Sequence, residues 1–349
     1  MRVYLDHNAT TPLVAEARAA MMAAMDVVGN PSSVHAEGRA AKALIESARA
    51  DVAAALGADG CDVVFTSGAT EAAALALAGR DLDCASVEHD AVAAWCRDGL
   101  PVDAAGRVSV ADPGRAALQL ANSETGVVQT LPEGLAVSDL TQGFGKIPFA
   151  FNWLGITMGL VSAHKLGGPK GVGALILRPG TEIAAQLRGG GQEMGRRAGT
   201  ENLIGIAGFA AAARRAAQHL ADGDWDRVAE LRTILENGLA ESDENAMFPG
   251  SGAEAAPRLP NTTCVISPGW KGETQVMQMD LAGFAISAGS ACSSGKVRAS
   301  RVLRAMGYDE MQVASAIRIS LGIGTTRDQV DRFLRAWESA HRRHRARHG

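Results

Sequence analysis

Hydrophobic and polar residues follow two alternating patterns along the chain, one typical of helices and one of strands. Residues 35–58 place apolar side chains on one face at helical spacing and predict an amphipathic helix. The run DVVFTSG, which begins at residue 62, predicts a short strand and a turn. The run ATEAAALALAG predicts a second helix over 69–79. Helix and strand therefore alternate early in the chain.

Further short apolar runs predict buried strands. They are CASV at 84–87, LQLAN at 118–122, LAVSD at 135–139, GLVSA at 159–163 and GVGALIL at 171–177. Strands that alternate with helices indicate an α/β fold with a mostly parallel central sheet flanked by helices. One connection departs from this pattern: between Gln129 and Asp139 there is almost no room for the helix that a parallel crossover usually carries.

The chain becomes rich in loop residues at 241–261, which predicts a domain boundary near residue 240. Its 349 residues are enough for two domains of ordinary size. We expect residues 12–240 to form a large domain, and residues 1–11 with 241–349 to form a smaller α+β domain. A long helix from about residue 326 ends the chain, and Thr326 and Gln329 are spaced to form a capping box at its start.

Composition excludes several classes of protein. A net charge of −4 argues against nucleic acid or an anionic membrane as the main partner. The uncharged run 147–164 is long enough to suggest a membrane-spanning helix. Its Pro, Asn and Gly residues and its lack of helical periodicity predict buried strands and turns instead. The first residues contain no apolar stretch of signal-peptide type, so we expect a cytoplasmic protein.

The cysteines point to one candidate nucleophile. Five cysteines without a Cys-x-x-Cys pair fit neither a disulfide framework nor a structural zinc site, and we expect no metal. Four of them resemble ordinary buried thiols. Cys292 differs, because it lies in SAGSACSSGK among small residues, with Lys296 nearby. Such a segment predicts an exposed loop, and the lysine favours the thiolate form of Cys292.

A lysine that follows the uncharged run suggests Schiff-base chemistry. Lys165 lies in SAHKLGGPKG at 162–171, where partial withdrawal from water lowers the basicity of an amine and makes it a nucleophile. The strand–turn–helix FTSGATE can bind phosphate through its helix N-terminus. Asp139 ends one predicted strand and His89 follows another. Taken alone, these are also compatible with an ordinary loop lysine, a βα turn, a turn aspartate and a structural histidine.

Together these features fit one cofactor, pyridoxal 5'-phosphate. This cofactor needs a lysine for its aldehyde, an acid opposite its pyridine nitrogen and donors for its phosphate. A flat side chain such as His89 can stack on the ring.

The chain also resembles the NifS/IscS-type cysteine desulfurases of the class V aminotransferase superfamily, nearly from end to end. The motifs that carry the resemblance are YLDHNATTP at 4–12, GNPSSVHAEGR at 29–39, FTSGATE at 65–71, EHDAV at 88–92, NSETGVVQ at 122–129, SAHKLGGPKGVGAL at 162–175, GGGQEMGRRAGTEN at 189–202, SAGSACSSGK at 287–296 and IRISLG at 317–322. The resemblance implies the fold-type I architecture of PLP-dependent transferases.

The resemblance also implies a role for each site residue. Lys165 would link to the cofactor aldehyde, Asp139 would face the pyridine nitrogen, Gln142 the phenolic oxygen, and His89 the face of the ring. The implied phosphate ligands are Ala69, Thr70, Ser162, His164 and, from the second subunit of a homodimer, Thr200. Arg318 would bind the substrate carboxylate, and its apolar neighbours Ile317 and Ile319 argue against a surface arginine.

The implied activity converts L-cysteine to L-alanine, with a persulfide on Cys292 that passes to a sulfur acceptor such as an iron–sulfur scaffold protein. Two features depart from the family. Ser123 stands where the family usually has a second asparagine, and we expect it near the phenolic oxygen of the cofactor. The connections at 79–84 and 124–138 are short, which leaves the partner surfaces in doubt. The alternatives are a selenocysteine lyase, another class V enzyme such as a small aminotransferase, and a non-catalytic scaffold.

Overall fold

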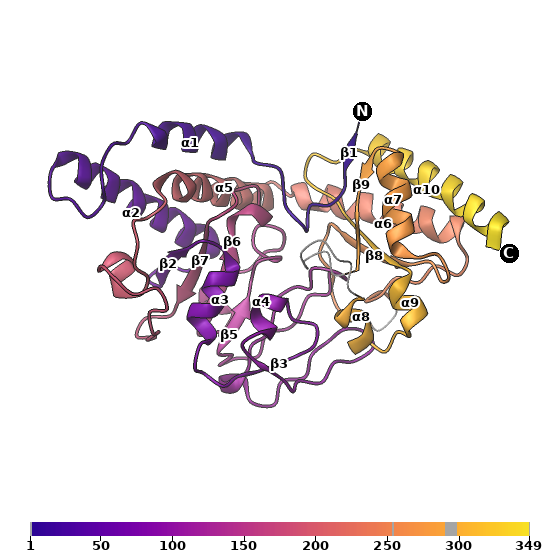
Figure 1. Ribbon diagram of the computed structural model, residues 1–349, viewed down its shortest axis with the longest axis horizontal. Coiled ribbons are helices and arrows are strands. Elements are labelled where there is room, and N and C mark those ends of the chain that lie inside the picture. Colours follow the sequence, from indigo (N-terminus) through magenta and orange to yellow (C-terminus); the bar gives the residue numbers. More distant parts are fainter. Residues whose placement is uncertain (1, 253–254, 290–298, 349) are drawn as a thin grey trace.

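A four-stranded sheet forms the centre of the N-terminal part of the molecule, in a computed structural model that describes residues 2–252, 255–289 and 299–348 (Figure 1). The strand order is β2-β7-β6-β5, with bounds Asp62–Thr66, Gly173–Leu177, Met158–Ser162 and Val137–Asp139. Strands β2, β5 and β6 share one direction, and β7 is antiparallel to both of its neighbours. The α/β class is confirmed. The reversal of β7 follows from the short connection 163–172, which contains no α-helical crossover and so returns antiparallel.

Helices cover both faces of this sheet. Alternate residues of β2 point to opposite sides: Val63 and Phe65 belong to one core and Val64 to another. The first core is closed by α2 (Ala36–Leu56) and α5 (Leu203–Ala221), with α1 (Ala15–Met25) packed on α5. The second core is closed by α3 (Ala69–Leu77) and α4 (Asp90–Ala93). The result is a three-layer sandwich.

The helix predictions of the N-terminal part are confirmed to within two residues. His35 caps the start of α2, and Gly57 ends it in the left-handed region with φ 61°. The strand prediction at 84–87 is largely wrong, because only Asp83–Cys84 forms β3, which pairs with β4 (Arg97–Asp98). Residues 118–122 form no named strand. They run along β5 all the same, since the Leu118 and Leu120 N–H groups donate to the carbonyls of Val137 (3.0 Å) and Asp139 (2.8 Å).

The connection before β5 contains no helix, as predicted: residues 129–136, all described, run as loop and turn. The uncharged run 147–164 contains β6 between two short 3-10 turns, Phe151–Trp153 and Ala163–Lys165, which confirms buried strands and turns. Among the described helices, none combines the length and apolar character needed to cross a bilayer.

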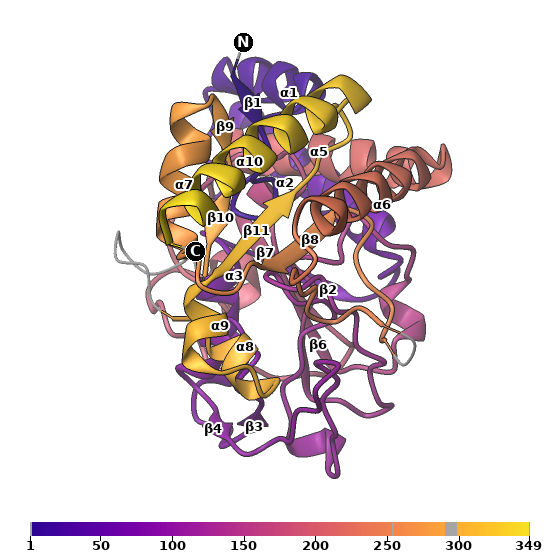
Figure 2. The ribbon, with the colours of Figure 1, turned by 90° about the vertical axis from the view of Figure 1, so that its right-hand side faces the viewer.

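The C-terminal part has its own antiparallel sheet and core. Its order is β10-β11-β8, with bounds Ser287–Ala288, Ala316–Ser320 and Thr262–Ile266. Its main helices are α6 (Asp224–Ser242), α7 (Gly272–Leu281) and α10 (Arg327–His348), which lie on one face (Figure 2). Short helices α8 (Arg301–Ala305) and α9 (Glu310–Ala314) lie between β10 and β11 in sequence.

Both ends of the chain join this C-terminal part. Strand β1 (Val3–Tyr4) pairs with β9 (Phe284–Ala285), and Val3 packs in the same core as α6 and α10. The capping box of α10 is confirmed, since Thr326 N donates to Gln329 Oε1 (3.1 Å) and Gln329 N to Thr326 Oγ1 (3.3 Å).

The domain boundary near 240 stays a prediction. The buried face of α6 packs in the C-terminal core through Val228, Leu231, Leu235 and Leu239. This packing supports a domain boundary earlier in the chain, near Gly223, just after the end of α5.

Strand β11 turns a charged residue toward the N-terminal part. Ile317 and Ile319 face the helices of the C-terminal core, so Arg318 between them points to the opposite side of the sheet. Arg318 therefore faces the ends of the central strands.

Candidate active site

A cavity of about 570 Å³ lies between the ends of the central strands and β11. It brings together ten of the twelve predicted site residues, namely Ala69, Thr70, His89, Ser123, Asp139, Gln142, Ser162, His164, Lys165 and Arg318. Thr200 is exposed and lines a different, smaller cavity beside Ser67 and Gly171. Cys292 and Lys296 lie outside the described residues.

One end of the cavity offers donors for an anion. Helix α3 begins at Gly68 without a side-chain cap, so its first N–H groups are open to a ligand. Gly68 has φ 155° and ψ 178°, a conformation that in practice only glycine adopts. A Cβ on Gly173 would lie 2.8 Å from Gly68 Cα, so the turn packs directly on the backbone of β7. Ser162, at the end of β6, completes this wall of the cavity.

His164 lies near this end in its neutral form. Its Nδ1 is 3.1 Å from Thr10 Oγ1. Burial, assisted by the neighbouring Lys165 and Lys170, lowers the pKa of His164 to about 4. At neutral pH the imidazole is therefore uncharged and can either donate or accept a hydrogen bond.

The Lys165 amine lies inside the cavity and contacts the N-terminal segment of the chain. Its Nζ donates to the backbone carbonyls of Asn8 (2.6 Å) and Ala9 (2.9 Å). The 3-10 turn at the end of β6 positions it. Lys170 also lines the cavity, whereas Lys146 does not.

Three side chains face the cavity from the strand ends. Asp139 ends β5, and its Oδ1 accepts from Thr141 N at 2.9 Å. The buried Gln142 amide donates from Nε2 to the Asn8 carbonyl at 3.0 Å. His89 caps α4 by accepting from Ala91 N at Nδ1 (3.1 Å), so the proton of the neutral ring is on Nε2. His89 therefore has a structural role, as the cap of α4, and also lines the cavity.

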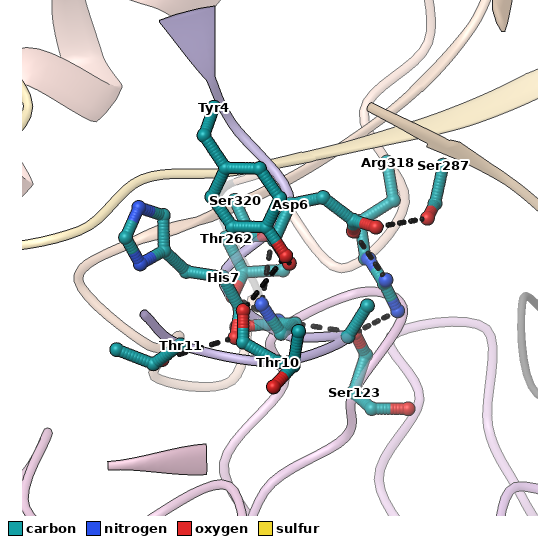
Figure 3. A network of polar contacts seen from close by, with 12 residues as sticks. Tyr4, Asp6, His7, Thr10, Thr11, Ser123, Thr262, Ser287, Arg318 and Ser320 are labelled. Carbon is teal, nitrogen blue, oxygen red and sulfur yellow. Dashed lines mark hydrogen bonds and ion pairs between the residues drawn. The ribbon is translucent and has the colours of Figure 1, made fainter. Parts of the chain in front are cut away.

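Arg318 is buried and fixed by two partners, which excludes a surface arginine. Its Nη2 lies 2.8 Å from Asp6 Oδ1, and its Nη1 donates to the Ser123 carbonyl at 3.1 Å (Figure 3). Asp6 Oδ2 in turn accepts from Ser287 Oγ at 2.8 Å. The contact places Ser123 beside Arg318, and its expected position near the phenolic oxygen of a cofactor stays a prediction.

Asn8, which had no predicted role, joins both ends of the site. Its Nδ2 donates to the Ser123 carbonyl (3.1 Å) and to Thr262 Oγ1 (2.8 Å). Its backbone carbonyl accepts from both Lys165 and Gln142. The available signal was the pair of polar residues, Asp6 and Asn8, beside an apolar N-terminal strand in a motif that had no assigned role.

The donors fit a phosphorylated pyridine aldehyde. The cavity holds a primary amine, an uncapped helix N-terminus for a phosphate, a carboxylate at a strand end and a buried guanidinium for a second carboxylate. In the part of the chain that the structure describes, no three His, Cys, Asp or Glu side chains cluster as a metal site. The four described cysteines, Cys61, Cys84, Cys96 and Cys264, are free thiols.

Known proteins resemble this chain in sequence and in structure. The family described as Aminotransferase class-V matches residues 3–95 and 112–333. A cysteine desulfurase of Cereibacter sphaeroides is 40% identical over 95% of this chain and 94% of its own length. A cysteine desulfurase of Klebsiella pneumoniae is 39% identical over 95% and 90%. The crystal structure of a NifS-like protein from Rickettsia africae superposes with a TM-score of 0.88 at 31% identity, over 98% of this chain and 99% of that one.

The Asp6–Arg318 pair generates a stability prediction. Asp6→Ala leaves the Arg318 guanidinium, of which only 3% is exposed, without its counter-charge. We expect a loss of about 3–5 kcal/mol in the free energy of unfolding, measured by urea denaturation. Asp280→Ala is the matched control, because Asp280 also pairs with an arginine, Arg2, but both side chains are more than half exposed. The control should change stability little, and equal losses in the two variants would contradict the prediction.

Proposed function

The chain belongs to the aminotransferase class-V family, and we propose that it is a pyridoxal phosphate-dependent cysteine desulfurase that converts L-cysteine to L-alanine. The observation that carries this proposal is the single cavity that holds Lys165, Asp139, Arg318 and the open N-terminus of α3. Relatives that carry the name cysteine desulfurase, matched over nearly their whole length, support it.

The residues of the cavity fit the cofactor as follows. The N–H groups of Ala69 and Thr70, with Ser162 and His164, would hold the phosphate. Lys165 would hold the aldehyde and Asp139 the pyridine nitrogen, with Gln142 at the phenolic oxygen and His89 at the ring face. When bound, pyridoxal phosphate withdraws electrons from an amino acid, which makes the α-hydrogen acidic and opens the bond to the β-sulfur.

The side chains of this protein do the rest. Arg318 orients the substrate by its carboxylate: Asp6 and the Ser123 carbonyl take one N–H on each terminal nitrogen, and the second N–H on each remains for a bidentate contact. The Lys165 amine, once released to the cavity, takes the proton from the substrate α-carbon. The Cys292 thiolate then forms an S–S bond to the substrate sulfur as the C–S bond breaks. The electron pair of the broken C–S bond stays with the carbon that becomes the methyl group of alanine.

The sulfur leaves the protein on Cys292 as a persulfide. We infer that an acceptor protein takes it, and that an iron–sulfur scaffold is one such acceptor. The same proposal includes a cytoplasmic location and a homodimer, with neither nucleic acid nor membrane as a partner.

The first prediction tests the activity and the lysine together. The purified protein should release alanine from L-cysteine, with sulfide under a reductant, and Lys165→Ala should lose this activity. Borohydride should fix the cofactor on Lys165, as mass spectrometry of the peptides can show. A label on Lys170 or Lys146 would overturn the assignment. Release of selenide from L-selenocysteine, with no release of sulfide from L-cysteine, would favour the selenocysteine lyase.

The second prediction separates the cofactor chemistry from sulfur transfer. Cys292→Ala should bind the cofactor and still change its visible absorption when cysteine is added, yet release almost no alanine and carry no persulfide by mass. Cys61→Ala is the control, since Cys61 is half-buried, donates to Asn152 Oδ1 and has a pKa raised by burial. Alanine formation by Cys292→Ala near the wild-type rate would refute the proposed nucleophile.

The third prediction concerns the second subunit. Thr200 is exposed and lies outside the main cavity of its own protomer, as a residue that completes a partner's site should. We expect a dimer by analytical ultracentrifugation, and Thr200→Val should lose cofactor faster on dialysis than the wild type. A fully active monomer at micromolar concentration would rule this arrangement out.

A further inference from the structure

A buried lysine lies next to the active-site cavity. Lys146 is 3% exposed, and its Nζ donates to two neutral oxygens, Gln142 Oε1 at 2.6 Å and Asn8 Oδ1 at 3.2 Å. In the described part of the chain no acidic side chain pairs with it, whereas buried charges are normally paired. Burial, assisted by the positive charges of Lys165 and Arg318, lowers the pKa of Lys146 well below its ordinary value.

Lys146 does not reach the cavity itself. Gln142 lines the active-site cavity, while Lys146 lines a neighbouring cavity of about 300 Å³ together with Trp225 and Leu166. Contact between Lys146 and a ligand in the active site therefore runs through the residues that Lys146 touches, of which Gln142 is the nearest.

The two contacts of Gln142 leave its amide a single orientation. The Gln142 atom facing Lys146 is Oε1, at 2.6 Å, and the Lys146 amine donates to it. The other contact of the amide fixes this orientation. A backbone carbonyl can only accept, so the atom facing the Asn8 carbonyl is Nε2. One hydrogen of Nε2 is used on Asn8, and the other remains for a group in the cavity.

We propose that Lys146 is a positioning residue of the active site, which holds the Gln142 amide so that its NH₂ group serves as the donor to the phenolic oxygen of the cofactor. The inference rests on the proposed function, because it takes pyridoxal phosphate as the ligand. It explains why an unpaired lysine occupies a buried position: its hydrogen bond polarises the Gln142 amide and strengthens its remaining N–H as a donor.

The test is a double-mutant cycle on the holoenzyme, read from its visible absorption as a function of pH. A hydrogen bond to an anionic oxygen favours the deprotonated state, so its loss raises the midpoint of the titration. We expect Gln142→Leu and Lys146→Met each to raise the midpoint, the former by about one pH unit. The double variant should match Gln142→Leu alone, because Lys146 acts through Gln142. Lys271→Met, at an exposed lysine outside both cavities, should leave the midpoint unchanged.

Other outcomes overturn the inference. Additive shifts would mean that Lys146 acts as an independent charge, and an unshifted Lys146→Met would mean that it does not act on the site. Lys146→Arg, which keeps an N–H donor beside the neighbouring cavity, should not raise the midpoint. If Lys146→Met does not fold, a raised midpoint in Lys146→Arg decides against the proposal. Borohydride labelling of Lys165 distinguishes failure of the proposed function from failure of this inference. No label in the wild type refutes the proposed function. A label on Lys165, with no shift of the midpoint in Lys146→Met, refutes only the role of Lys146.

Discussion

The burial of Arg318 is the constraint on which the site depends. A guanidinium that is almost removed from water needs a counter-charge, since an uncompensated buried charge costs several kcal/mol. Asp6 supplies that charge at 2.8 Å from the opposite end of the sequence. The N-terminal segment must therefore leave β1, pass beside Ser320 of β11 and enter the site, which is the path that the Asp6–Ser320 bridge and the Asn8 N–H to Ser320 Oγ bond (2.9 Å) record.

Once Asp6 has brought this segment into the site, its next residues determine the geometry at the cofactor end. The Asn8 carbonyl accepts from Lys165 and Gln142, and the Asn8 side chain accepts from Lys146 and Asn261. The group proposed to bind the substrate and the groups proposed to bind the cofactor thus share one short stretch of backbone. Asp6 lies two and three residues before Asn8 and Ala9, whose carbonyls accept from the Lys165 amine. A displacement of Asp6 would therefore also displace the partners of Lys165.

The parts of the site that the sequence predicts are those with a local signal. Lys165 follows an apolar strand, Gly68 separates a strand from a helix, and Arg318 interrupts a run of branched apolar residues. The signal for Asn8 was weaker, and the contacts of Asn8 with Lys146 and Asn261 join segments that meet only in the folded chain. Residues 118–122 were predicted as a strand and do run along β5. The reversed direction of β7 was not predicted, although the short connection 163–172 carries a signal for it.

The same network includes described residues that precede and follow Cys292 in the chain. Before Cys292, Ser287 donates to Asp6, the partner of Arg318. After it, Ser300 caps α8 and donates to Glu124, the neighbour of Ser123, whose carbonyl accepts from Arg318. On one side, Ser287 is therefore bonded directly to a group that holds the guanidinium. On the other side, Ser300 is bonded to Glu124, the residue next to a second such group. If Arg318 binds the substrate carboxylate, the described residue Ser287 and the substrate share Asp6 and Arg318 as one hydrogen-bonded pair.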